Sequence, residues 1–166
     1  MRPIVLLLAA LFGPPLLAVD LTDVAQPAQV NRLFKPAAKL RVVNIWATWC
    51  LPCVKEMPDL QAVDAHFSDA DVQIVGVTLD DAIPDPRDER KQLVRKFLGK
   101  YKIDFRNAYY TGRIITIQDH YNFADIPVTL VFDRNGRELA RHEGAVTKAK
   151  FIRELNTLLK KQGGSR

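Results

Sequence analysis

The chain has 166 residues, of which 48% are hydrophobic and 26% charged, and its net charge is +5 at pH 7. This length suits one domain, large enough to bury a core without a disulfide scaffold. Cationic residues are mixed with Asp and Glu, and no Lys/Arg-rich tract resembles a nucleic-acid-binding patch, so we expect no nucleic-acid partner.

The first predicted element is an uncharged, mostly apolar run over residues 3–18, directly after Met1 and Arg2. The run is short for a transmembrane helix, which needs about 20 residues, and a Gly-Pro-Pro sequence interrupts it. It predicts either a secretory signal cleaved after Ala18 or an uncleaved N-terminal anchor, with the folded part outside the cytoplasm, as in a periplasm. Residues 19–39 show no sustained period and are predicted to be a lead-in segment.

The only two cysteines, Cys50 and Cys53, follow the first predicted strand, residues 41–48. That strand is a continuous β-branched and aromatic run, as expected for a strand buried on both faces of a parallel sheet. Apolar residues then recur at helical spacing over residues 60–67. A CxxC motif that begins a helix after a buried strand is typical of a thioredoxin-like redox site.

A zinc site is an alternative use of the two thiols. Zinc takes three or four protein ligands, and the three histidines (His66, His120 and His142) lie far apart in the sequence. A disulfide across CxxC closes too short a loop to constrain the unfolded chain much, so stability does not explain the pair. We predict a reversible dithiol/disulfide couple without metal or cofactor, since no Gly-rich nucleotide motif is present.

The rest of the chain alternates between the two periodicities. The predicted elements are a strand at 72–80, a charged loop at 80–90, a helix through Leu93 that ends at 99–102, a strand at 104–110, a helix at 113–123, a hairpin at 128–144 and an amphipathic helix at 149–161. Asn135-Gly136 in the hairpin suits the positive φ angles of a tight turn. This order predicts an α/β fold over residues 40–162, with a central mixed sheet and helices on both faces.

Two stretches resemble the TlpA/ResA-like branch of the thioredoxin superfamily: NIWATWCLPCVKEMPDL (residues 44–60) and ADIPVTLVFDRNGREL (residues 124–139). The resemblance covers residues 42–160 in element order. It implies a thioredoxin-like fold and an extracytoplasmic thiol–disulfide oxidoreductase, often anchored by its N-terminal segment. It also implies a disulfide-bearing client protein, a membrane-embedded thiol electron donor, and a preference for reduction, for example of apocytochrome or copper-site cysteines.

The resemblance implies that Cys50 is the exposed nucleophile and Cys53 the shielded resolving thiol. Elementary electrostatics agrees, because the unpaired N–H groups and dipole of a helix N-terminus favour a thiolate at Cys50. Trp49 is expected either to cover the site or to be an ordinary core tryptophan.

Glu56 lies three residues after Cys53, so on a helix its carboxylate lies on the same side as that sulfur. A partly buried carboxyl group there has a raised pKa and can take the proton that Cys53 gives up. In cytoplasmic thioredoxins a buried acid on the preceding strand is thought to do this; the matching residue here is Asn44, which cannot titrate. The resemblance suggests that Glu56 takes over, and a solvated first-turn glutamate is the alternative.

Pro127 is the last candidate, and the resemblance implies that its peptide bond is cis and that it faces the CxxC motif. The backbone of Ile126 would then offer N–H and C=O groups to an extended client peptide. An edge-strand proline without a special role is the alternative.

Three other functions use the same residues. A thiol oxidant or isomerase differs only in reduction potential, and a copper metallochaperone would bind Cu(I) through both thiolates. A thiol peroxidase needs a Thr and an Arg beside its reactive cysteine, and Thr48 is poorly spaced from Cys50 for that role.

Overall fold

The computed structural model describes residues 20–84 and 86–163, so the predicted signal or anchor segment lies outside the described residues. A six-stranded mixed sheet in the order β1-β4-β3-β2-β5-β6 forms the centre. The strands are β1 (Leu21–Val24), β2 (Leu40–Trp46), β3 (Val72–Thr78), β4 (Arg106–Tyr110), β5 (Val128–Asp133) and β6 (Glu138–Glu143). Strands β1 to β4 pair in parallel, and β5 is antiparallel to both β2 and β6.

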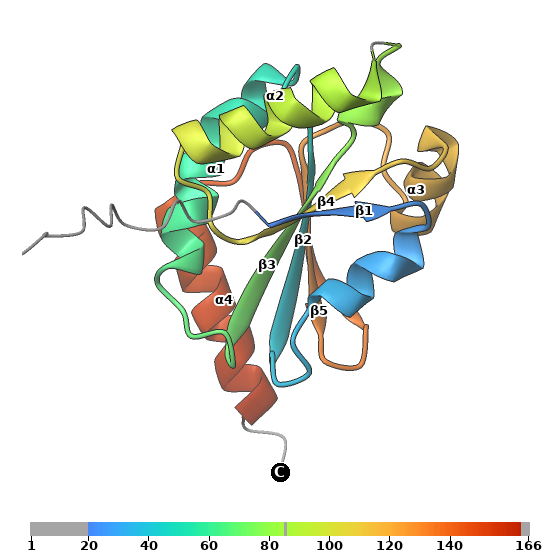
Figure 1. The fold of residues 1–166 in the computed structure, drawn as a ribbon. Helices are drawn as coiled ribbons and strands as arrows, with labels where there is room; N and C mark the ends of the chain where they lie inside the picture. The colour runs from blue at the N-terminus through green and yellow to red at the C-terminus, as the bar shows by residue number, and fades with distance from the viewer. Residues whose placement is uncertain (1–19, 85, 164–166) are drawn as a thin grey trace, which may run out of the picture.

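Helices cover both faces of this sheet (Figure 1). They are η1 (Pro27–Leu33), α1 (Leu51–Asp64), η2 (Asp80–Ala82), α2 (Arg87–Lys100), α3 (Ile114–Tyr121) and α4 (Lys148–Gly163). One core cluster joins the sheet to α1, α2 and α4, and a second joins its other face to η1 and α3. The predicted α/β class, with a central mixed sheet and helices on both faces, is therefore confirmed.

Helix α2 begins at Arg87, inside the stretch predicted to be a loop. Two acidic residues in its first turn, Asp88 and Glu89, complement the helix dipole. Val94 and Leu98 are buried, whereas Leu93 is 47% exposed. Among the helices of residues 20–84 and 86–163, none combines the length and hydrophobicity that a transmembrane segment needs.

The segment predicted to be only a lead-in contributes a strand and a helix to the fold. Strand β1 pairs in parallel with β4, where Leu21 lies opposite Asn107. Val30 and Phe34 are buried in the core on the η1/α3 face. A four-residue strand and a seven-residue 3₁₀ helix are too short to show a hydrophobic period, so sequence patterning did not detect them.

The hairpin between β5 and β6 is confirmed, but its turn differs from the predicted one. Asp133 C=O accepts from Gly136 N–H at 3.0 Å, and Asp133 N–H donates to Arg137 C=O at 2.9 Å. Gly136 has a φ of 83°, whereas Asn135 is not among the described residues with positive φ. Only the glycine therefore adopts the left-handed conformation, as in a type I turn followed by a bulge.

Candidate active site

The CxxC motif lies at the carboxyl ends of the central parallel strands. In register, Trp46 at the end of β2 lies opposite Thr78 at the end of β3, and α1 begins at Leu51. Pro52 in the first turn costs no hydrogen bond, because its missing N–H would have no partner within the helix. The local sequence thus brings a buried strand, a short loop and a helix N-terminus together at one point.

Cys50 and Cys53 form a disulfide with an S–S distance of 2.05 Å. Cys50 is the N-cap residue of α1, and Cys53 N–H donates to Cys50 Sγ at 3.3 Å. Cys50 is 6% exposed, whereas Cys53 is fully buried. Cys50 is thus the more accessible of the two cysteines, as a nucleophile needs to be, and Cys53 is the shielded one. Cys50 is nevertheless largely buried and not exposed as the sequence analysis expected.

The loop before β5 closes over the first cysteine. The Ile126–Pro127 peptide bond is cis, and Ile126 O lies 3.6 Å from Cys50 Sγ. Pro127 C=O accepts from Gly144 N–H at 2.8 Å, which fixes this loop to the end of β6. The structure therefore brings Cys50, Ile126 and Pro127 together, although they are far apart in the sequence.

Glu56 is buried beneath the helix rather than solvated, with 2% of its surface exposed. Its Oε1 accepts from Asn44 Nδ2 and its Oε2 accepts from Val146 N–H, both at 2.8 Å. Desolvation by burial raises the pKa of Glu56 to about 7, although the two hydrogen bonds act in the opposite direction. A carboxyl group with this pKa can both accept and release a proton near neutral pH.

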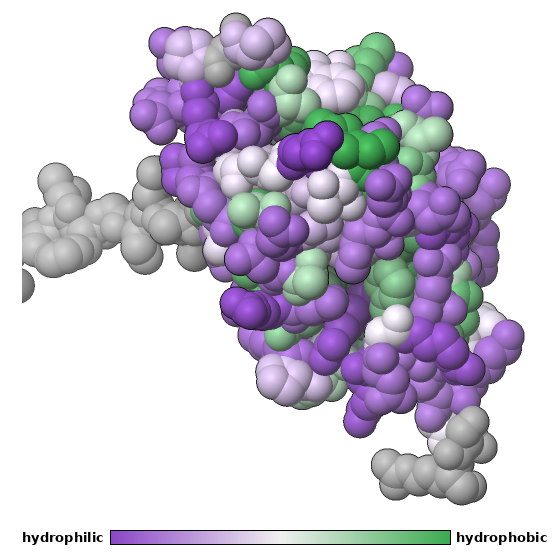
Figure 2. Space-filling view, turned by 90° about the vertical axis from the view of Figure 1, so that its right-hand side faces the viewer, coloured by the Kyte–Doolittle hydropathy of each residue, from purple (hydrophilic) through white to green (hydrophobic). Residues whose placement is uncertain are grey.

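Trp49 is 49% exposed, so it is not a core tryptophan. Its neighbour Leu51 is 62% exposed, and Ile115 near the start of α3 is 50% exposed. Figure 2 shows that hydrophobic residues gather in the upper part of an otherwise mainly hydrophilic face. The two chain neighbours of Cys50, Trp49 and Leu51, therefore both present exposed apolar side chains.

Sequence reasoning missed Asp80, a fully buried carboxylate that holds the loop before the cysteines. Its Oδ2 accepts from Thr48 N–H at 3.0 Å and from the Thr78 hydroxyl group, and its Oδ1 accepts from the Thr48 hydroxyl group. Asp80 stands where the predicted strand 72–80 meets the predicted charged loop 80–90, and an acidic residue at the end of a buried strand is the signal that could have found it. This network fixes the segment that positions Cys50.

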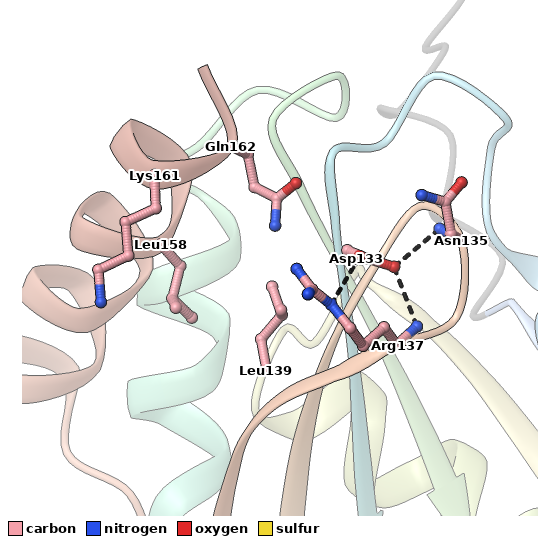
Figure 3. A pocket seen from close by; sticks show the side chains of 7 residues that line it. All are labelled: Asp133, Asn135, Arg137, Leu139, Leu158, Lys161 and Gln162. Carbon is pink, nitrogen blue, oxygen red and sulfur yellow. Dashed lines mark hydrogen bonds and ion pairs between the residues drawn. The ribbon is translucent and has the colours of Figure 1, made fainter. Parts of the chain in front are cut away.

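The three histidines do not form a metal site with the cysteines. Within the described part of the chain, we find no group of three His, Cys, Asp or Glu side chains that could hold a metal ion. A pocket of about 550 Å³ lies between the β5–β6 turn and the end of α4 (Figure 3). Its residue Asp133 lies opposite Leu40 at the start of β2, so the pocket is at the end of the sheet away from the cysteines.

A mixed sheet, a CxxC disulfide at a helix N-terminus and a facing cis-proline define a thioredoxin-like protein with a redox-type cysteine pair. The Redoxin family matches residues 13–160, so the chain belongs to that family. Within the thioredoxin superfamily it is ResA-like, as the two stretches around the cysteines and the proline predicted.

The relatives include two proteins described as thiol-disulfide oxidoreductase ResA. The one from Bacillus subtilis is 29% identical over 118 residues, which is 71% of this chain and 60% of that protein. The one from Oceanobacillus iheyensis is 29% identical over 121 residues, which is 73% of this chain and 58% of that protein. The chain thus spans about three fifths of the length of these curated relatives.

Two solved structures have the same fold. StoA from Bacillus subtilis superposes with a TM-score of 0.57 at 25% identity, over 71% of this chain and 82% of that chain. A thiol-disulfide isomerase from Corynebacterium glutamicum gives a TM-score of 0.62 at 21% identity, over 78% of this chain and 84% of that chain. The second likeness bears on the fold alone.

Proposed function

We propose that this protein is a thiol–disulfide oxidoreductase that reduces disulfides of client proteins outside the cytoplasm through the Cys50/Cys53 couple. The observation that carries the proposal is the placement of the CxxC disulfide at the N-terminus of α1, with Ile126 O 3.6 Å from Cys50 Sγ. The helix N-terminus favours a thiolate at Cys50, and in this proposal the neighbouring Ile126 backbone pairs with an extended client peptide.

The reaction starts from the reduced dithiol. The Cys50 thiolate attacks one sulfur of the client disulfide, so that a mixed disulfide forms and the other client sulfur leaves as a thiolate. Cys53 then gives its proton to the Glu56 carboxylate and attacks Cys50 Sγ. The Cys50–Cys53 bond forms, the client sulfur leaves with the electron pair of the broken bond, and two electrons have passed to the client.

The couple must be reduced again after each turnover. We propose that a membrane-embedded thiol donor does this and that the predicted N-terminal segment, residues 3–18, takes the chain across the membrane as a signal or anchor. Clients of the kind that the resemblance implies are apocytochromes and copper-site proteins whose cysteines have formed disulfides.

Replacement of Cys53 by Ala tests the chemistry directly. The variant should hold clients on Cys50 as mixed disulfides that a reducing agent releases, because the second thiol that resolves them is missing. The matched control, Cys50→Ala, retains one thiol in the shielded position and should trap at least about tenfold less. Equal trapping by both variants, or by neither in an oxidising compartment, would contradict the proposal.

The direction of electron flow requires a separate measurement. A reduction potential of the Cys50/Cys53 couple in the range of thioredoxin, about −270 mV, supports a reductase. A strongly oxidising potential of about −120 mV would instead indicate that the protein is a thiol oxidant.

A further inference from the structure

Asn44 is fully buried in β2, opposite Thr129 of β5 and beside the Glu56 carboxyl group. Its Nδ2 donates to two acceptors, Glu56 Oε1 at 2.8 Å and Thr129 Oγ1 at 3.0 Å. Its Oδ1 has no hydrogen-bond donor among the residues that the structure describes. The amide nitrogen thus makes two hydrogen bonds and the amide oxygen makes none. This imbalance requires an explanation, because unpaired buried polar atoms are unfavourable.

The observed orientation of the amide matches the ionised form of Glu56, in which both oxygens act only as acceptors. Both carboxylate oxygens accept N–H groups, Oε1 from Asn44 and Oε2 from the Val146 backbone. A proton on Oε1 would point its O–H at the Asn44 N–H, so two donors would face each other. Because burial keeps the pKa of Glu56 at about 7, both forms are populated near neutral pH.

We propose that the Asn44 side-chain amide rotates by half a turn when Glu56 takes up a proton, and so positions Glu56 for proton exchange in both states. After rotation, Oδ1 accepts from the Glu56 O–H and from the Thr129 hydroxyl. Thr129 allows this exchange, because a hydroxyl group accepts a hydrogen bond in one state and donates one in the other. Asn44 therefore keeps two hydrogen bonds whether Glu56 is charged or neutral.

This exchange gives Asn44 a defined part in the resolving step, and that part rests on the proposed function. When the Cys53 thiol transfers its proton to the Glu56 carboxylate, no buried hydrogen bond to Asn44 has to be lost. The proton is held on Oε1 until Glu56 releases it. Asn44 touches neither the client nor the reacting sulfurs in this scheme, so it is a positioning residue.

The rotation can be observed in the oxidised protein by NMR, with labels on the Asn44 amide and the Thr129 side chain. About two pH units above the pKa of Glu56, the Asn44 NH₂ protons should show a nuclear Overhauser contact to Thr129. The same distance below that pKa, the contact should be lost as the oxygen replaces the nitrogen. A contact that persists at low pH overturns the proposal.

Glu56→Gln is the matched control, because the NH₂ group of the new side chain imitates the protonated carboxyl group at every pH. The introduced amide can accept from Val146 N–H and donate to Asn44 Oδ1, so the contact from the Asn44 NH₂ group to Thr129 should be absent throughout the pH range. A contact that persists in this variant overturns the proposal as well. A pH-dependent loss that is equal in wild type and variant would have another cause and would also overturn it.

The catalytic consequence is measured on the two half-reactions separately. Asn44→Leu should slow release of the client from the Cys50 mixed disulfide about tenfold near pH 7, and should change the initial attack by Cys50 less than about twofold. If Asn44→Leu does not fold, Thr129→Val is used instead, with Thr129→Ser as the control that keeps the hydroxyl group. Unchanged release in the folded variants overturns the positioning role.

These outcomes separate the rotation from the proposed function. If the wild-type protein exchanges no disulfides but the pH-dependent contact is observed, the proposed function fails and the hydrogen-bond exchange stands. If disulfide exchange proceeds and the contact does not change with pH, the proposed function stands and the amide rotation fails.

Discussion

Glu56 is the residue in which burial and chemistry conflict most directly. Folding removes its carboxyl group from water and raises its pKa from 4.5 to about 7. A carboxyl group whose pKa is raised in the folded state contributes its stabilisation below the unfolded pKa, and this contribution is lost as the pH rises through the folded pKa. The burial of Glu56 thus costs the folded protein stability as the pH rises from about 4.5 to about 7.

Replacement of Glu56 by Gln should remove this loss. At about pH 9 we expect the oxidised variant to be more stable than wild type by up to about 3 kcal/mol, whereas the two should differ much less at about pH 4. Urea unfolding at a series of pH values measures the difference. Asp64→Asn is the control, because burial and nearby carboxylates raise the pKa of Asp64 to about 6. The stability difference between this variant and wild type should therefore stop growing at a lower pH than for Glu56→Gln. Parallel stability curves for wild type and Glu56→Gln would contradict the prediction.

The two tryptophans, Trp46 and Trp49, test the interpretation of the site at the same scale. Trp49→Ala should change the free energy of unfolding by less than about 1 kcal/mol, because the side chain is 49% exposed. Client reduction should fall about tenfold if the indole ring lies against the bound peptide. Trp46→Ala, by contrast, empties a fully buried position and should cost about 4 kcal/mol. Chemical denaturation and client turnover of both variants check this; unchanged turnover in Trp49→Ala would remove Trp49 from the client-binding surface.

At the scale of elements, long periodic segments were predictable and short ones were not. The strand–CxxC–helix unit and helix α4 follow from apolar residues at regular spacing over seven or more positions. Strand β1 has four residues and η1 seven, and their burial depends on β4 and α3, which lie about 80 residues further along the chain. Such pairing is decided by tertiary contacts, which a local pattern does not contain.

The segment before β2 should therefore behave as part of the domain. Phe34 follows η1 and is 6% exposed in the core on the η1/α3 face. Phe34→Ala should cost about 3 kcal/mol of unfolding free energy, because it leaves a cavity there. Leu93→Ala, at a position that is 47% exposed, should cost less than about 1 kcal/mol. Equal midpoints in urea for the two variants would show that residues before β2 add little to the fold.

In the whole molecule, the candidate site is an assembly of segments that only the complete fold brings together. The CxxC motif could be named from its spacing, whereas Glu56 and the Ile126–Pro127 pair were named with the help of the family resemblance. The contacts that set their properties could not be predicted, although Asn44 itself was named: Asn44 and Val146 N–H reach Glu56, and Asp80 reaches Thr48. Predicting these contacts needs the register of β2 against β3 and β5, and in this chain register is fixed by long-range pairing.

Replacement by alanine should change the stability of the protein in opposite directions at two glycines, Gly76 and Gly99. Gly76 in β3 faces Asn107 and Trp46, and a Cβ atom there would lie 2.1 Å from Asn107 Oδ1. That oxygen accepts from Trp46 Nε1 at 3.1 Å inside the core. Gly99 in α2 is exposed, and an added Cβ would meet no atom within 4 Å.

Gly76→Ala should therefore destabilise the protein by about 3 kcal/mol, because the added methyl group overpacks the core and breaks a buried hydrogen bond. Gly99→Ala should stabilise it by about 0.5–1 kcal/mol, because alanine restricts the unfolded chain and favours the helix. Urea denaturation of both variants, with the disulfide intact, measures the two signs. If Gly76→Ala were as stable as wild type, the close packing of β2, β3 and β4 beneath the cysteines would not exist as described.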